Sequence, residues 1–240
     1  MPENNPSYPS LDEPPQRSIV SRLVTTIIAL VIFCGVWFLI AGRPDWWQGW
    51  IFLFAFIIFV SVLVWRVSKV NPDLVQERNR PAEVAEPWDR AVMGIYSLIL
   101  VALLIVVALD GGRYAWSVVP LGVQIIGWIL LVVAGAIVWH VMLKNAYLSS
   151  WARIQDDRGQ VVVQDGLYQY IRHPMYSGII IAFLAIPLAL GSWWALIPSV
   201  VIIGLFIYRT YREDRMLMDG LAGYAEYAEV VKQKLIPRIW

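Results

Sequence analysis

Five long stretches of this 240-residue sequence contain no charged side chain. They are Leu23–Gly42, Trp46–Trp65, Ala91–Leu109, Tyr114–Leu143 and Pro174–Tyr208. An α-helix of about 20 apolar residues is long enough to cross the hydrocarbon layer of a bilayer. The composition agrees, since 59% of the residues are hydrophobic and only 15% are charged. The sequence therefore predicts an all-α integral membrane protein that lies in a lipid bilayer.

The last uncharged stretch, Pro174–Tyr208, is too long for a single membrane helix. A helix of this length would measure about 52 Å, well beyond the thickness of a bilayer. The pair Gly191-Ser192 lies at its middle and is followed by two tryptophans, a pattern that favours a turn. We therefore predict a tight helical hairpin, which brings the number of transmembrane helices to about six.

The distribution of basic residues supports six crossings. With this number, every Lys and Arg except Arg43 and Arg113 falls on one side of the membrane. Segments rich in Lys and Arg stay in the cytoplasm, so we expect a multi-pass protein with both termini cytoplasmic. Five crossings would place the basic C-terminal segment on the opposite side. The expected location is the cell (inner) membrane in a bacterium or the endoplasmic reticulum in a eukaryote.

Three regions follow from this arrangement. Residues 1–16 contain five prolines and no apolar periodicity, which predicts a disordered cytoplasmic tail. Residues 17–143 hold four transmembrane spans with a cytoplasmic loop at 66–90, in which one helical turn is expected on the membrane surface. Residues 144–240 hold the hairpin, a cytoplasmic C-terminal helix and the candidate site.

Several functional classes are excluded by composition. The net charge of +1 offers no general attraction for nucleic acid. One cysteine, Cys34, and two histidines provide neither a disulfide nor a zinc cluster, so no metal is expected. Six tryptophans near the ends of apolar stretches are predicted to be interfacial anchors. These are Trp46, Trp47, Trp50, Trp65, Trp193 and Trp194.

The predicted hairpin brings two groups of ionisable residues together. Arg172 to Tyr176 precede it, and Arg209 to Asp214 follow it, so both lie at one membrane face. Arginines there can simply anchor to phosphates, but a mixed cluster indicates a functional site. The carboxylates of Glu213 and Asp214 favour cationic or hydroxyl-bearing partners. The alternative is pairing within the helix, with Arg209, Arg212 or Arg215.

These segments carry a resemblance to a known family. The string from Val161 to Gly178 (VVVQDGLYQYIRHPMYSG), with Glu213–Leu217 and Gly223–Tyr227, resembles the C-terminal half of the isoprenylcysteine carboxyl methyltransferases and related phospholipid N-methyltransferases. The resemblance covers about residues 145–240. It implies S-adenosyl-L-methionine as the cofactor.

The resemblance also implies a set of site residues. Cofactor-binding positions would be Gln155, the strand-like Gln160, Val161, Val162 and Val163, then Tyr168, His173, Pro174, Met175, Tyr176 and Glu213. Arg209 matches the position that orients the substrate carboxylate, so Arg209 and Glu213 are the expected catalytic residues. Gln160 departs from the histidine common in eukaryotic members, and Asp214 replaces a second glutamate.

The implied activity is methyl transfer to a lipophilic or prenylated acceptor that enters laterally from the bilayer. A carboxylate acceptor is ionised at pH 7 and needs no general base, whereas an amine would need Glu213, Asp214 or His173 as the base. One alternative is an NADPH-dependent sterol-type reductase, although those enzymes typically carry Asn where this chain has Met175. Another is a non-enzymatic scaffold or transporter. The sequence leaves the acceptor and the oligomeric state open.

Overall fold

The computed structural model describes residues 19–240, with side chains from Ile27 onward, and every regular element in this part is helical. The predicted tail at residues 1–16 lies outside the described residues. The α-helices are α1 (Ile19–Ala41), α2 (Trp47–Val70), α3 (Pro72–Arg78), α4 (Pro87–Val107), α5 (Leu121–Lys144), α6 (Pro174–Ala189), α7 (Leu196–Gly220) and α8 (Tyr224–Val230). Shorter helical turns are η1 (Ala82–Val84), η2 (Ala108–Tyr114), η3 (Asp156–Arg158) and η4 (Gly166–Gln169). The all-α prediction is confirmed for these residues.

Three helical segments are long and apolar enough to cross a membrane: α2, α4 continued through η2, and α5. The apolar helices Ile27–Ala41 and Pro174–Ala189 are shorter. At 1.5 Å per residue, α6 measures about 24 Å, which a bilayer accommodates by local thinning. The chain is therefore a membrane protein, while six crossings and their orientation remain predictions.

The hairpin predicted between residues 174 and 208 is present. Helices α6 and α7 lie side by side and are joined by a short turn in which Gly191 has a φ of +77°. Helix α5 packs tightly on α6, because a methyl group on Gly127 would lie 2.5 Å from the backbone nitrogen of Ala189. Close packing of this kind lets small residues hold apolar helices together where hydrophobic burial contributes little.

A buried carboxylate, Asp110, fixes the turn of the hairpin. Its oxygens accept hydrogen bonds from the backbone N–H (2.7 Å) and hydroxyl (2.6 Å) of Ser117 and from the hydroxyl of Ser192 (2.6 Å). Asp110 belongs to η2, which continues α4, so these bonds tie the α6–α7 turn to the end of α4.

Trp46 contradicts its prediction as an interfacial anchor. It is 2% exposed, and its ring lies 5.2 Å from that of Trp37, measured between centroids. The chain reverses between α1 and α2, and this reversal directs the ring between the two helices, where Gly49 leaves room for it. The other five tryptophans named above are exposed or half-exposed.

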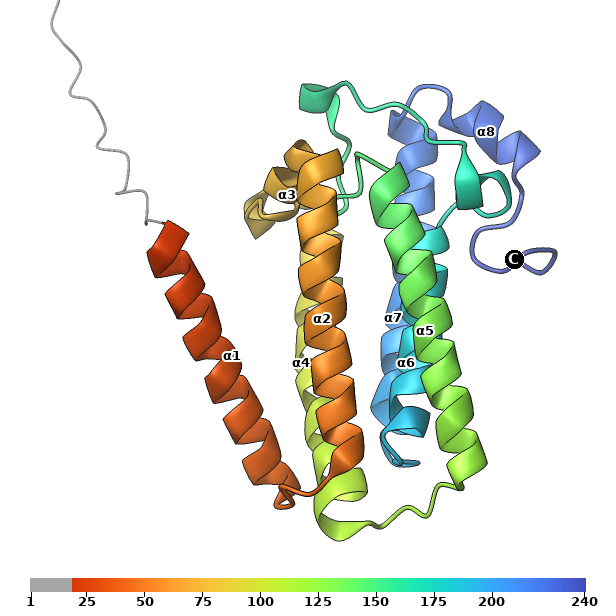
Figure 1. The fold of residues 1–240 in the computed structure, drawn as a ribbon. Coiled ribbons are helices and arrows are strands. Elements are labelled where there is room, and N and C mark those ends of the chain that lie inside the picture. The colour runs from red at the N-terminus through yellow and green to blue at the C-terminus, as the bar shows by residue number, and fades with distance from the viewer. Residues whose placement is uncertain (1–18) are drawn as a thin grey trace, which may run out of the picture.

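The connecting segments divide between the two ends of the helical bundle. Helix α3, the 145–173 segment and α8 gather at one end, shown at the top of Figure 1. The links after α1 and α4 and the α6–α7 turn lie at the opposite end. The described segments that were predicted to be cytoplasmic therefore share one end of the molecule, and that end carries the candidate site.

We expect Asp110→Ala to lower the free energy of unfolding by about 2 kcal/mol, because it leaves the hydroxyls of Ser117 and Ser192 without their acceptor. Unfolding of detergent-solubilised protein by sodium dodecyl sulfate would measure this. Asp45→Ala is the matched control at the same end, since the Asp45 side chain is 72% exposed and its ion pair with Arg43 contributes little. Equal effects of the two substitutions would contradict the role of Asp110 in fixing the turn of the hairpin.

Candidate functional site

A cavity of about 300 Å³ lies at the α3 and α8 end of the bundle. Its walls come from the end of α3, the first turns of α4, the 145–163 segment, η4, the start of α6, one side of α7, and α8. Most of the predicted site residues line it: Gln155, Gln160, Val161, Val162, Val163, Tyr168, His173, Met175, Tyr176, Arg209 and Glu213. The fold thus brings into one cavity residues that are more than fifty positions apart.

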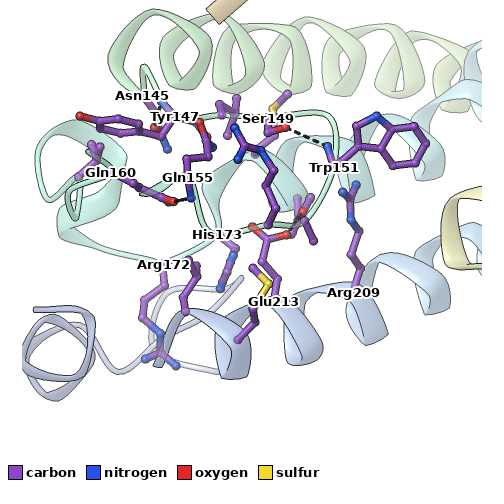
Figure 2. Close-up of a pocket in the computed structure, with 18 of the residues that line it drawn as sticks. Asn145, Tyr147, Ser149, Trp151, Gln155, Gln160, Arg172, His173, Arg209 and Glu213 are labelled. Carbon is purple, nitrogen blue, oxygen red and sulfur yellow. Dashed lines mark hydrogen bonds between the residues drawn. The ribbon is translucent and has the colours of Figure 1, made fainter. Parts of the chain in front are cut away.

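Helix α7 supplies a stripe along one wall. Phe206, Arg209, Glu213 and Leu217 recur every three or four residues, so they project from the same face of the helix. The stripe spans about 16 Å of helix. Figure 2 shows Arg209 and Glu213 projecting from this helix toward the loop that carries Ser149 and Trp151.

The two ends of the cavity differ in polarity. At the Phe206 end the walls are side chains of the membrane helices, namely Met93 and Tyr96 from α4 and Ile179 from α6. The other walls come from the 145–163 segment with its amide and hydroxyl groups. The cavity therefore joins the apolar interior of the bundle to the polar segments at its end.

The residues predicted to be strand-like, Gln160 to Val163, lie in a segment without regular secondary structure. Gln155 holds this segment in place: its backbone N–H donates to the side-chain oxygen of Gln160 (2.8 Å). The Gln155 side chain is itself occupied, because its Nε2 donates to the carbonyl of Tyr147 (2.6 Å) and its oxygen accepts from Arg158. Gln155 thus shapes the wall, whereas the side-chain nitrogen of Gln160 has no hydrogen-bond partner among the described residues.

Two buried tyrosines support the same wall. The hydroxyl of Tyr168 accepts a hydrogen bond from Asn145 (2.7 Å), and the hydroxyl of Tyr227 donates to the Tyr168 carbonyl (2.6 Å). Burial raises the pKa of Tyr168 above its usual range and that of Tyr227 to about 12. Both phenols are therefore neutral at physiological pH.

Pro174 does not line the cavity. It is buried at the first position of α6, where proline is favoured because the missing N–H would have no partner within the helix. Its neighbour His173 does line the cavity, with its ring stacked on that of Tyr176 at 5.8 Å between centroids. Pro174 therefore contributes to the start of α6 and not to the cavity wall.

The adjacent carboxylates of Glu213 and Asp214 lie in different surroundings. Glu213 lines the cavity and accepts a hydrogen bond from the hydroxyl of Tyr176. Asp214 is buried and makes a bidentate pair with Arg172 at 2.7 and 2.9 Å. The prediction of hydroxyl-bearing and cationic partners is confirmed, and pairing within α7 is not observed among the described residues.

Asp214 organises a buried polar cluster. Besides Arg172, its oxygens are reached by the Tyr224 hydroxyl (2.9 Å), His173 Nε2 (3.2 Å) and Lys234 Nζ (3.2 Å). Burial opposes ionisation, but the hydrogen bonds from His173 and Arg172 outweigh it and hold the pKa of Asp214 far below its usual range. The cluster ties the start of α6 to α7, α8 and the C-terminal segment.

Arg209 has a partner that the sequence did not reveal. Asp89, fully buried in the first turn of α4, lies 2.8 Å from Arg209 Nε, measured to Oδ1. Arg209 Nη2 also donates to the second oxygen of Asp89 (3.1 Å) and to the carbonyl of Ser150 (3.0 Å). Its guanidinium lies 5.4 Å from the centre of the Tyr176 ring. The charge of Arg209 is thus already matched before any substrate binds.

Sequence reasoning missed Asp89 because it lies outside the segments that carry the family resemblance. One signal was available: a carboxylate at the mouth of an apolar stretch needs a partner. That partner, Arg209, is 120 residues away along the chain. Within residues 19–240 no group of three or more His, Cys, Asp or Glu side chains is suited to holding a metal ion.

We expect Asp214→Asn to lower the free energy of unfolding at pH 7 by about 3 kcal/mol, because Arg172 is left buried without its counter-charge. The folded-state pKa lies below that of the unfolded chain, so as the pH falls the unfolded chain binds the proton first. The contribution of Asp214 is complete above about pH 5 and is lost progressively below about pH 4. Denaturant unfolding at several pH values should show the wild type and the variant converging in acid. The exposed Asp156→Asn is the control, and a constant difference at every pH would contradict the assignment.

We further expect Arg209→Gln and Asp89→Asn to destabilise the fold singly by about 3 to 5 kcal/mol, because each leaves a buried charge unpaired. The double substitution should cost less than the sum, with a coupling energy of about 1 to 3 kcal/mol. Combining Asp89→Asn with the exposed Arg215→Gln serves as the control, and those two effects should add. Additivity in the Arg209 and Asp89 cycle would show that the two charges do not depend on each other.

The comparison with curated proteins gave no match. Residues 128–219 match the isoprenylcysteine carboxyl methyltransferase (ICMT) family. The match begins in α5 and ends in α7, so it contains α6, the 145–173 segment and the stripe of α7 that lines the cavity. This region of the membrane protein is thus similar to the isoprenylcysteine carboxyl methyltransferase family.

Proposed function

We propose that this chain transfers the methyl group of S-adenosyl-L-methionine to a lipophilic acceptor, and that the acceptor group is a carboxylate of the isoprenylcysteine type. The observation that carries this proposal is the environment of the Glu213 carboxylate in the cavity. In the described part of the chain it is the one carboxylate that lines the cavity, and no Lys or Arg side chain lies within salt-bridge distance of it. A carboxylate in this position is suited to a cationic ligand.

The residues present fit the cofactor. S-adenosyl-L-methionine carries a sulfonium and an ammonium, and Glu213 offers them the unpaired negative charge. Val162, Val163 and Met175 provide apolar surface, and Tyr168 provides an aromatic one. The volume of about 300 Å³ lies at the lower end of the range for small-molecule pockets.

When bound, the cofactor supplies a methyl group that is already activated by the positive sulfur. The chain then has to bind and orient the two reactants and exclude water. Holding them at near-attack distance contributes on the order of 7 to 11 kcal/mol. A carboxylate acceptor is ionised at neutral pH, so the cavity needs no side chain to remove a proton. Burial among membrane helices removes water from that carboxylate and makes it more reactive.

The same geometry supports different roles for Glu213 and Arg209 in this proposal. Glu213 is held by the Tyr176 hydroxyl and faces the cavity, so it acts directly on the cofactor. Arg209 is held by Asp89 and by the Ser150 carbonyl, and it lies over Tyr176. In this proposal Arg209 holds Tyr176 and the 148–152 loop in position. It does not bind the substrate carboxylate by itself.

The apolar end of the cavity supports a lipophilic acceptor. Met93, Tyr96, Ile179 and Phe206 belong to helices that pass through the apolar part of the bundle, so a hydrocarbon chain entering from the bilayer would meet matching surface. We infer that the α3 and α8 end faces the cytoplasm, from which the water-soluble cofactor arrives, in a chain of six crossings. Residues 144–240 would then form the main part of the catalytic region.

We expect Glu213→Gln to reduce affinity for S-adenosyl-L-methionine at least about tenfold, because a charged partner of the cation is lost. Isothermal titration of the purified protein in detergent measures this. Glu229→Gln is the control, since Glu229 is exposed on α8 and does not line the cavity. A parallel titration with NADPH distinguishes the reductase class. Binding of NADPH but not of S-adenosyl-L-methionine by the wild type would overturn the proposal.

A further inference from the structure

Four arginines line the cavity, and three of them are matched by carboxylates. The pairs are Arg153 with Glu77 and Asp157 (both 2.8 Å), Arg172 with Asp214 (2.7 Å), and Arg209 with Asp89 (2.8 Å). The fourth is Arg78, and no carboxylate of the described residues lies within salt-bridge distance of it. Arg78 lies outside residues 128–219, so the family match says nothing about it.

The backbone around Arg78 is fixed. It is the last residue of α3, and its carbonyl accepts a hydrogen bond from the Ser150 hydroxyl (3.0 Å). Its Nη1 donates to the carbonyl of Leu148 (3.1 Å). A guanidinium has five N–H groups, so this contact leaves donors that can bind a further acceptor.

Arg78 and Arg209 are neighbours. Arg209 donates to the Ser150 carbonyl and Arg78 to the Leu148 carbonyl, two residues apart in the same loop. Burial, together with the positive charge of Arg209, lowers the pKa of Arg78. Two guanidinium groups therefore share this part of the cavity, and Asp89 offsets the charge of one.

An unmatched guanidinium at this place favours a carboxylate ligand. Burying a charge without a counter-charge is costly, and an incoming anion relieves that cost. The planar fork of an arginine also matches the two oxygens of a carboxylate. Two sources of such a carboxylate exist under the proposed function: the amino-acid part of the cofactor and the acceptor.

The position of Arg78 favours the acceptor. Arg209, its neighbour, follows Phe206 by one turn of α7 and also contacts Met93, and both of these side chains belong to the apolar end of the cavity. Glu213, the group suited to the cofactor cation, lies one turn farther toward the polar end. A lipophilic chain in the apolar end would bring its terminal carboxylate close to the two arginines.

We infer that Arg78 is a substrate-positioning residue that binds the carboxylate of the lipophilic acceptor, beside an Arg209 whose own charge is held by Asp89. This inference rests on the proposed function and names the residue that binds the carboxylate of its acceptor. It also assigns α3, which lies in the loop between α2 and α4, a part in the substrate site.

The test compares an acid with its neutral ester. The probes are N-acetyl-S-farnesyl-L-cysteine and its methyl ester, titrated into the purified full-length protein in detergent, with S-adenosyl-L-methionine titrated separately. The wild type should bind the acid at least about tenfold more tightly than the ester, because a charge-assisted bond is available to the acid alone. Arg78→Gln should reduce this preference to about twofold or less while leaving the affinity for S-adenosyl-L-methionine within about twofold. Arg78→Lys should restore part of the preference, since it keeps the charge but loses the fork.

The control is Arg66→Gln, which removes a positive charge from an exposed position on the last turns of α2, outside the cavity. It should keep the acid-to-ester preference of the wild type. Each variant is checked for folding by its thermal unfolding midpoint in detergent, and Arg78→Lys serves as the working variant if Arg78→Gln unfolds.

Three results would overturn the inference. The first is a wild type that binds the acid no more tightly than the ester, including a failure to bind either. The second is an unchanged preference in Arg78→Gln, or in Arg78→Lys if that is the working variant. The third is a loss of S-adenosyl-L-methionine affinity in the Arg78 variant, which would assign Arg78 to the cofactor carboxylate. A wild type that does not bind S-adenosyl-L-methionine at all would instead refute the proposed function, so the two failures are distinguishable.

Discussion

The buried pair between Arg172 and Asp214 determines where the rest of the site lies. Arg172 precedes α6 and Asp214 belongs to α7, so their pairing fixes the cavity end of the hairpin. The backbone N–H groups of Arg172 and His173 also donate to the carbonyls of Gln233 and Lys234 (both 2.9 Å), which holds the C-terminal segment against the same point. With this end fixed, Tyr176 meets Glu213, and both face the cavity.

The other end of the hairpin is fixed by a second buried carboxylate, Asp110. A hairpin held at both ends by hydrogen-bonded carboxylates is restrained against sliding, because any shift would leave charged oxygens without donors in an apolar environment. Two apolar helices in a membrane gain little from hydrophobic burial against each other, so polar contacts of this kind determine their register. The register in turn decides which residues of α7 face the cavity.

The cavity is shared between the part of the chain that matches the ICMT family and the part that precedes it. The matching part supplies Tyr176, Arg209 and Glu213, while α3 and α4 supply Arg78, Met93, Tyr96 and the carboxylate that holds Arg209. Three of the arginines are paired with carboxylates, whereas Arg78 and Glu213 have no salt-bridge partner among residues 27–240, and in our proposal they offer opposite charges to ligands. Under the proposed function, the first half of the chain therefore contributes to acceptor binding as well as to membrane anchoring.

The sequence by itself determined the helical class, the apolar character of the helices and the hairpin with its turn at Gly191-Ser192, and through the family resemblance it pointed to eleven of the residues that line the cavity. These features follow from local properties of the sequence: the length of the uncharged stretches, the turn signal in the middle of Pro174–Tyr208, and the short motifs on either side of that stretch. Tertiary structure alone decided that Asp214 is structural while its neighbour Glu213 faces the cavity, that Trp46 is core, and that Asp89 neutralises Arg209. The physical reason is that a charge is matched or unmatched according to contacts between helices, and such contacts join residues as far apart as Asp89 and Arg209, which no local pattern encodes.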